Sequence, residues 1–126
     1  MKPPTPSPDD PRKGLREICL ALPETIEKET WGEPTFRVRD KIFAMFTHNE
    51  PDDGHVALWC KAPEGVQEIL VSAAPQRFFV PPYVGSKGWI GLRLDVHVDW
   101  SEVADLVNDS YQMTAPKRLV ASLAQR

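Results

Sequence analysis

Apolar residues recur with helical spacing near the start of the chain. Four of them follow one another at i, i+3, i+4 and i+7: Leu15, Ile18, Cys19 and Leu22. This spacing places them on one face of an amphipathic helix. Asp9 or Asp10 is a suitable N-cap, with Pro11 in the first turn. We expect the helix to end before Pro23, because a proline disfavours helical geometry in the residue before it.

The middle of the chain changes to alternating apolar and polar residues, which is typical of β-strands. The expected strands are residues 25–30, 35–39, 41–47, 55–61 and 89–95. The first strand is polar throughout and suits a half-exposed sheet edge. A tight turn at 39–41 joins the second strand to the third, and a loop at 48–54, dense in turn-forming residues, precedes the fourth.

Helical patterns return in the second half of the chain. One helix begins at Pro63-Glu64-Gly65 and stops at Pro75, and its expected buried face is made of Val66, Ile69, Leu70 and Ala73. Asp99 caps the next helix, with Glu102 at the capping-box spacing. A short last helix starts near residues 114–116.

The order of elements is a helix, antiparallel strands with one inserted helix, and then further helices. It predicts a two-layer α+β fold, in which N- and C-terminal helices pack on one face of an antiparallel β-sheet. The proline-rich residues 1–8 are expected to form a disordered tail. Residues 9–126 are expected to form a single domain.

Composition narrows the possible functions. The 126 residues carry a formal net charge of −3, with a pI of about 5.6, whereas a non-specific nucleic-acid binder is expected to show a basic patch and a pI above ~9. Cys19 and Cys60 form no CxxC pair, and the N-terminus has no apolar run like that of a signal peptide. No stretch approaches the ~18 apolar residues of a membrane span. We therefore expect a cytoplasmic protein with free thiols and no membrane partner.

Several motifs, taken in order, resemble those of the MmcQ/YjbR-like family. They are W-G-x-P-x-F-R-V from Trp31 to Val38, Lys41-Ile-Phe-Ala44, V-x-L-x-x-K from Val56 to Lys61, Pro63-Glu64, Trp89-Ile90, Val98-Asp99-Trp100 and Ser110-Tyr111. The resemblance runs from about Leu15 to Leu119. Two departures are an expanded polar loop at 48–54 and Trp59 before Cys60.

The resemblance implies a CyaY-like, or frataxin-like, fold. It also implies a poorly known function, commonly labelled DNA-binding through a double-wing arrangement of hairpins, and no established catalytic residues. The nucleic-acid-binding residues proposed on this basis are Arg37, Arg39, Lys61, Lys87 and Arg93. Alternation places Arg37 and Arg39 away from the core, where they can meet phosphates. The competing interpretation is a solvated sheet face whose charges serve solubility and prevent edge pairing.

Two tryptophans support a second hypothesis. Alternation places Trp59 and Trp89 on the sheet face that the helices leave uncovered. With Phe79 and Tyr83 they would form a face for a small molecule, a protein partner or stacked bases. The other possibility is that both indoles are buried under the segment 78–83, against Phe78, Phe79 and Tyr83.

Catalytic and metal-binding motifs are not found in the sequence. The loop from His48 to His55 has the spacing of neither an EF-hand nor a zinc site. Four glutamates, Glu24, Glu27, Glu29 and Glu33, are too dispersed for an iron site. A phosphate-binding glycine loop, a nucleophile elbow and an HExxH helix are also lacking. We therefore expect a non-enzymatic binding protein with no cofactor, a monomer or weak homodimer whose partner is DNA, a small molecule or a protein.

Overall fold

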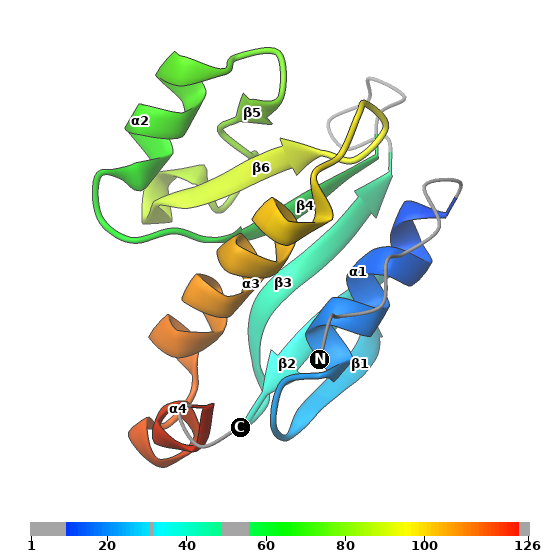
Figure 1. Ribbon diagram of the computed structural model, residues 1–126, viewed down its shortest axis with the longest axis vertical. Coiled ribbons are helices and arrows are strands. Elements are labelled where there is room, and N and C mark those ends of the chain that lie inside the picture. Colours follow the sequence, from blue (N-terminus) through cyan, green and yellow to red (C-terminus); the bar gives the residue numbers. More distant parts are fainter. Residues whose placement is uncertain (1–9, 31, 49–55, 124–126) are drawn as a thin grey trace.

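Six antiparallel strands form one open sheet in the structure, a computed structural model that describes residues 10–30, 32–48 and 56–123 (Figure 1). They are β1 (Thr25–Thr30), β2 (Glu33–Val38), β3 (Lys41–His48), β4 (Val56–Lys61), β5 (Phe78–Phe79) and β6 (Trp89–Arg93). Their order across the sheet is β1-β2-β3-β4-β6-β5. The segment at 78–83, expected to be a loop, contributes the short edge strand β5 because its backbone pairs with β6. The expected tail at 1–8 lies outside the described residues.

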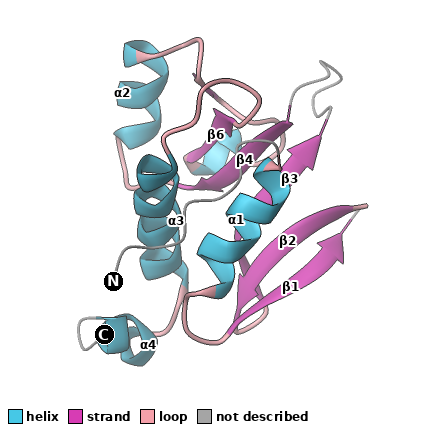
Figure 2. Ribbon diagram, turned by 45° about the vertical axis from the view of Figure 1, so that its right-hand side comes forward, coloured by secondary structure: helices cyan, strands magenta, loops and turns pink. Residues whose placement is uncertain are grey.

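Two helices cover one face of this sheet (Figure 2). Helix α1 (Pro11–Leu20) contacts β1 and β3, and α3 (Trp100–Thr114) contacts β3 and β4. Helix α2 (Val66–Ala73) adjoins β5, and α4 (Lys117–Leu123) follows α3 at the opposite end of the molecule (Figure 1). The expected α+β fold, an antiparallel sheet with N- and C-terminal helices, is confirmed. We call the side of the sheet opposite α1 and α3 the open face.

Both covering helices begin where their sequences predict. The carboxylate of Asp10 accepts the N–H of Lys13 at 3.1 Å, and that of Asp99 accepts the N–H of Ser101 at 3.0 Å. The carboxylate of Glu102, expected to complete a capping box, pairs with Arg77 at 2.6 Å instead. Helix caps of this kind are local in sequence, which is why the pattern alone could locate them.

A β-bulge in the β2–β3 hairpin decides which side chains of β3 face the core. Phe36 pairs with Ala44, whereas the next residue, Arg37, pairs with Ile42, so Phe43 is an extra residue in β3. Phe43 and Ala44 therefore both lie in the main core between sheet and helices, and Ile42 turns to the open face. Simple alternation along the strand does not predict this arrangement.

Ser110 and Tyr111 fasten α3 to the rest of the molecule. The Ser110 hydroxyl donates to the carbonyl oxygen of Phe43 at 2.6 Å and accepts the N–H of Lys61 at 2.9 Å. The Tyr111 hydroxyl donates to the carbonyl oxygen of Pro23 at 2.8 Å. Both residues are fully buried. Their role in the fold is therefore structural, since each joins elements that are distant in sequence.

The buried face expected for α2 is wrong in part. Ile69 is 66% exposed and Ala73 is also exposed, whereas Val66 and Leu70 pack partly against the main core. The reason is that α2 adjoins the edge of the sheet at β5 instead of lying across its face. An apolar stripe on a helix does not reveal how much of that stripe its neighbours cover.

Candidate functional site: a pocket on the open sheet face

A second, smaller apolar cluster lies on the open face. Its buried members are Met45, Ala57, Trp59 and Trp89, with Ile42, Phe79 and Val84 packed around them. Trp59 is only 3% exposed and Trp89 only 6%. The segment between α2 and β6 covers this part of the sheet, so both indoles are buried within a single chain.

Burial of the indoles corrects the expected exposed face. In the structure both indoles are buried, as the alternative interpretation predicted. The residues that cover them differ in part from the expected Phe78, Phe79 and Tyr83. Phe79 and Val84 pack on the cluster. Phe78 belongs to the main core on the opposite face, and Tyr83 is 80% exposed. The reason is that strand alternation within β5 sends Phe78 and Phe79 to opposite sides of the sheet.

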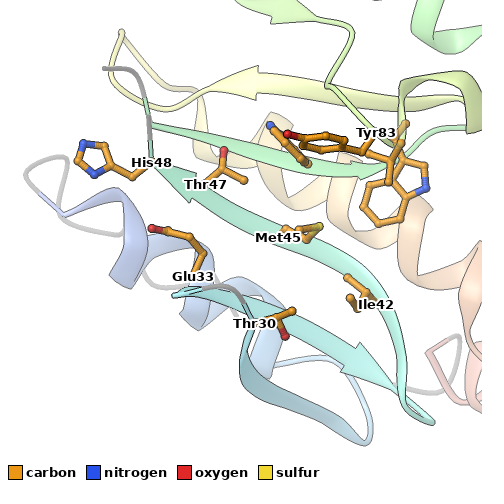
Figure 3. A pocket seen from close by; sticks show the side chains of 10 residues that line it. Thr30, Glu33, Ile42, Met45, Thr47, His48 and Tyr83 are labelled. Atoms are coloured by element: carbon orange, nitrogen blue, oxygen red, sulfur yellow. The ribbon is translucent and has the colours of Figure 1, made fainter. Parts of the chain in front are cut away.

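A pocket of about 670 Å³ opens beside this cluster (Figure 3). The residues that line it are Thr30, Glu33, Ile42, Met45, Thr47, His48, Trp59, Tyr83, Val84 and Trp89. Glu33, Thr47 and His48 lie at one end, and Ile42 and Tyr83 lie toward the other (Figure 3). The pocket therefore has a polar end and an apolar end, and it draws on all strands except β5.

Two buried polar atoms in this lining lack a hydrogen-bond partner within the described part of the chain. They are the indole Nε1 of Trp59 and the carboxylate Oε2 of Glu33. Leaving such a group unpaired costs roughly 1–3 kcal/mol, so proteins pair nearly all of them. One atom is a donor and the other an acceptor. A molecule in the pocket that offers the complementary groups would offset both costs.

Tyr83 stands at the rim of the pocket on a tightly curved segment. Its φ of +69° lies in the left-handed region, which is costly for a residue with a side chain. The segment is packed closely, because a Cβ on Gly85 would come within 2.4 Å of a methyl carbon of Val80. The side-chain amide of Gln67 donates to the carbonyl oxygens of Gly85 and Trp89 at 2.8 and 2.6 Å. These contacts hold Tyr83 in position beside the opening.

Two of the proposed nucleic-acid-binding cations are engaged within the protein. The Arg37 guanidinium donates to the hydroxyls of Thr30 and Thr35 at 2.9 and 3.3 Å, and its side chain is 14% exposed. Arg39 does not continue the alternation of β2. With Asp40 it forms the two-residue turn of the hairpin, both at positive φ, which is typical of a type I′ turn. Its guanidinium pairs with Glu24 at 2.9 Å.

The other three cations lie on β4, on β6 and in the short segment just before β6. Lys61 is paired across the strands with Trp89, and the exposed Lys87 precedes Trp89 by two residues in the short 3₁₀ helix η1 (Gly85–Lys87). Half-buried Arg93 pairs with Ala57 at the other end of β6. The strand register therefore places Lys61 beside Trp89, with Lys87 two residues before Trp89, and places Arg93 four residues away from Trp89 at the other end of β6.

The cysteines are core residues. Cys19 and Cys60 are free and fully buried. Burial raises the pKa of the Cys60 thiol to about 12, with a smaller contribution from Asp109. Burial likewise raises the pKa of the Cys19 thiol well above its ordinary value. A protonated, inaccessible thiol is a poor nucleophile. Among the described residues no three His, Cys, Asp or Glu side chains gather in a metal-binding group, and residues 49–55 of the loop considered for metal lie outside the described ranges.

Most of the pocket lining was not among the residues that the sequence singled out. In the sequence Glu33 is one of four dispersed glutamates, and Met45 and Thr47 are ordinary residues of an expected strand. Alternation along β3 places Met45 and Thr47 on one face, which is a signal that sequence could supply. The contribution of Glu33 from β2 depends on the pairing of strands and had no local signal.

The fold and the pocket define the class of protein: an α+β domain with an open antiparallel sheet that carries a pocket on the face opposite α1 and α3. The chain belongs to the YjbR family, whose model matches residues 20–113. The resemblance inferred from the ordered motifs is thereby confirmed. No curated protein matches the chain.

Two solved structures are similar to this chain. The crystal structure of Deinococcus radiodurans protein DR2400, with family-model domain DUF419, matches with a TM-score of 0.71 and 23% identity over 85% of this chain and 80% of that one. A protein from Pseudomonas syringae, a Northeast Structural Genomics Consortium target, matches with a TM-score of 0.61 and 17% identity over 82% of this chain and 97% of that one. At these identities the similarity concerns the fold. In the described ranges no helix has the length and apolar character needed to cross a membrane.

Proposed function

We propose that this YjbR-family protein is a non-enzymatic binding protein that takes a small organic molecule into the pocket on its open sheet face. The observation that carries the proposal is the combination of an apolar pocket of about 670 Å³ with two buried, unpartnered polar atoms in its lining. Small-molecule sites are mostly apolar hollows of roughly 300–1,000 Å³ with a few placed polar groups. The ligand would place its apolar body against Met45 and Trp89, an acceptor atom or the π face of a ring near the indole N–H of Trp59, and a donor near Glu33.

The test is a titration of small aromatic fragments by ligand-observed NMR and calorimetry. Fragments of about 15 non-hydrogen atoms should bind with Kd values in the micromolar to millimolar range. Ile42→Trp should abolish binding, because the larger ring occupies the pocket. Ile69→Trp makes the same change on an exposed position of α2 and should leave binding intact. Equal binding by both variants would show that the fragments bind elsewhere.

Weak nucleic-acid binding is a second candidate function, and one observation favours it. Lys61 and Lys87 flank the Trp89 position, and neither forms an ion pair with a described residue. Their charges are therefore available to phosphates, unlike those of Arg37 and Arg39. The acidic pI of about 5.6 favours the small-molecule proposal.

We also propose a reducing, cytoplasmic setting and a monomer or weak homodimer. The two buried free cysteines support the first, because thiols persist where disulfides are rare. Exposed Glu27, Lys28 and Glu29 on the edge strand β1 support the second, because charges on an edge discourage strand pairing between molecules.

A further inference from the structure

We propose that the molecule bound in the open-face pocket is an arylalkylamine, whose protonated amine binds Glu33 and whose ring lies against the apolar end. This inference rests on the proposed function and names the chemical class of its ligand. It is drawn from the distribution of charge and hydrogen-bond partners along the pocket.

Glu33 requires a donor that its surroundings do not supply. Its Oε2 is buried and accepts no hydrogen bond from the described residues. An ionised carboxylate is an acceptor only, and its strongest partner is a cationic N–H donor. Arg37, a cation on the same strand, pairs with Asp40 at 3.5 Å and is not available to it.

The hydroxyl protons of the two threonines in the lining, Thr30 and Thr47, are already used in hydrogen bonds within the protein. Thr47 donates to the carbonyl oxygen of Ala57 at 3.4 Å. Thr35 donates to the carbonyl oxygen of Lys28 at 2.6 Å, so in its 3.3 Å contact with Thr30 the proton comes from Thr30. The lining also contains His48, which is exposed at the polar end, and Tyr83, which lies toward the other end (Figure 3). No described residue of the lining therefore donates to Glu33 Oε2, and a ligand that carries a donor would fill this role.

The distance between the polar and the apolar end of the pocket determines how far apart the amine and the ring of the ligand must be. Thr35 pairs with Met45, and Glu33 lies two residues further along β2, about 7 Å in the strand direction. Met45 in turn pairs with Trp59, at the apolar cluster. An aromatic ring joined to an amine by a short alkyl chain spans this distance.

The experiment compares three indole probes that differ only in the polar group: tryptamine, tryptophol and indole-3-propionate. Calorimetry at pH 7 should give an affinity for tryptamine at least about tenfold above that for tryptophol, because a charge-assisted hydrogen bond is roughly twice as strong as a neutral one. Indole-3-propionate should bind most weakly, since its carboxylate meets Glu33. Glu33→Gln should reduce the tryptamine affinity to that of tryptophol. Glu29→Gln, the same change on the exposed strand β1, should have no effect.

The outcomes separate this inference from the proposed function. If all three probes bind equally and lose binding in Ile42→Trp, the pocket is a binding site but the amine preference is wrong. The amine preference is also wrong if Glu33→Gln leaves the tryptamine affinity unchanged. If none of the probes binds the wild-type protein and the fragment titration is also negative, both the ligand class and the proposed function are overturned.

Discussion

The ring of Phe79 lies directly on Gly91, its partner on the neighbouring strand. The two residues pair across β5 and β6, and a Cβ on Gly91 would lie 2.4–2.7 Å from three carbon atoms of the ring. The absence of a side chain at Gly91 lets Phe79 fold over the sheet and close the apolar cluster around Trp59 and Trp89. The burial of both indoles, and with it the wall of the pocket, depends on this contact.

Gly91→Ala should therefore destabilise the protein by about 1–3 kcal/mol, the usual cost of forcing an extra carbon into a packed site. Urea denaturation measures the change, and a red shift of tryptophan emission should accompany it as the indoles become hydrated. In a Phe79→Ala background the same substitution should cost much less, because the clashing ring is gone. An equal cost in both backgrounds would mean that the contact is not the cause.

Ser110→Ala should also cost about 1–3 kcal/mol in the free energy of unfolding. The substitution leaves the carbonyl oxygen of Phe43 and the N–H of Lys61 without the partner that now joins them. Ser122→Ala is the control, because its hydroxyl bonds only locally to the carbonyl oxygen of Leu119 within α4. A change below about 0.5 kcal/mol for Ser110→Ala, the range of ordinary surface substitutions, would contradict the bridging role.

Stability should decline in alkaline solution because folding raises the pKa of both thiols. Burial favours the neutral thiol. The contribution of each thiol to the free energy of unfolding is therefore complete below the pKa that the thiol has in the unfolded chain. It is lost as the pH rises toward the pKa in the folded protein, which is about 12 for Cys60. Above about pH 9 each thiol should lower the free energy of unfolding by about 1.4 kcal/mol per pH unit. The measurement is urea denaturation between pH 8 and about 11.

A variant with Cys19→Ala and Cys60→Ala controls for the other groups that titrate in this range. Loss of the two buried sulfur atoms lowers the free energy of unfolding of this variant at every pH. The quantity to compare is therefore the slope of the free energy of unfolding against pH. The variant should show the flatter slope. Identical slopes for variant and wild type would mean that the thiols do not carry the effect.

For the nucleic-acid hypothesis, the expected result is weak duplex binding that falls with salt, by about 0.9 in log K per phosphate contact for each tenfold rise. Removing the charges of Lys61, Lys87 and Arg93 together should weaken binding and flatten this slope. Arg39→Ala should have a smaller effect, because its guanidinium already pairs with Glu24. Fluorescence anisotropy with labelled DNA at two salt concentrations measures both quantities. Absence of binding at low salt, where screening is weakest, would reject the hypothesis.

The sequence was a good guide wherever the relevant interaction is local. Asp10 and Asp99 cap the helices that their spacing predicts, and the core-facing residues of β6, Ile90 and Leu92, follow from alternation. The α+β class followed from the order of such elements. A frataxin-like relationship stays a prediction, as do the DNA partner and the absence of enzymatic activity.

Expectations from the sequence were wrong or incomplete at positions where segments that are distant in sequence pack together. Alternation placed Trp59 and Trp89 on the open face, as they are, but could not show that Phe79 would cover them. It also gave Arg37 and Arg39 equal roles, whereas one folds onto neighbouring threonines and the other enters a turn. The exposure of a side chain depends on which other segments pack against it, and the periodic pattern of apolar residues along one strand does not specify those segments.

The sequence by itself determined the helices, most strands, the two faces of β4 and β6 and the YjbR-family resemblance, because capping and periodicity act over a few residues. Only the tertiary structure decided the bulge at Phe43, the burial of the indoles and the meeting of Glu33 with Trp59 around one pocket. Glu33 and Trp59 lie on strands separated by β3. Their common site therefore depends on strand order, which arises from the packing of the whole sheet.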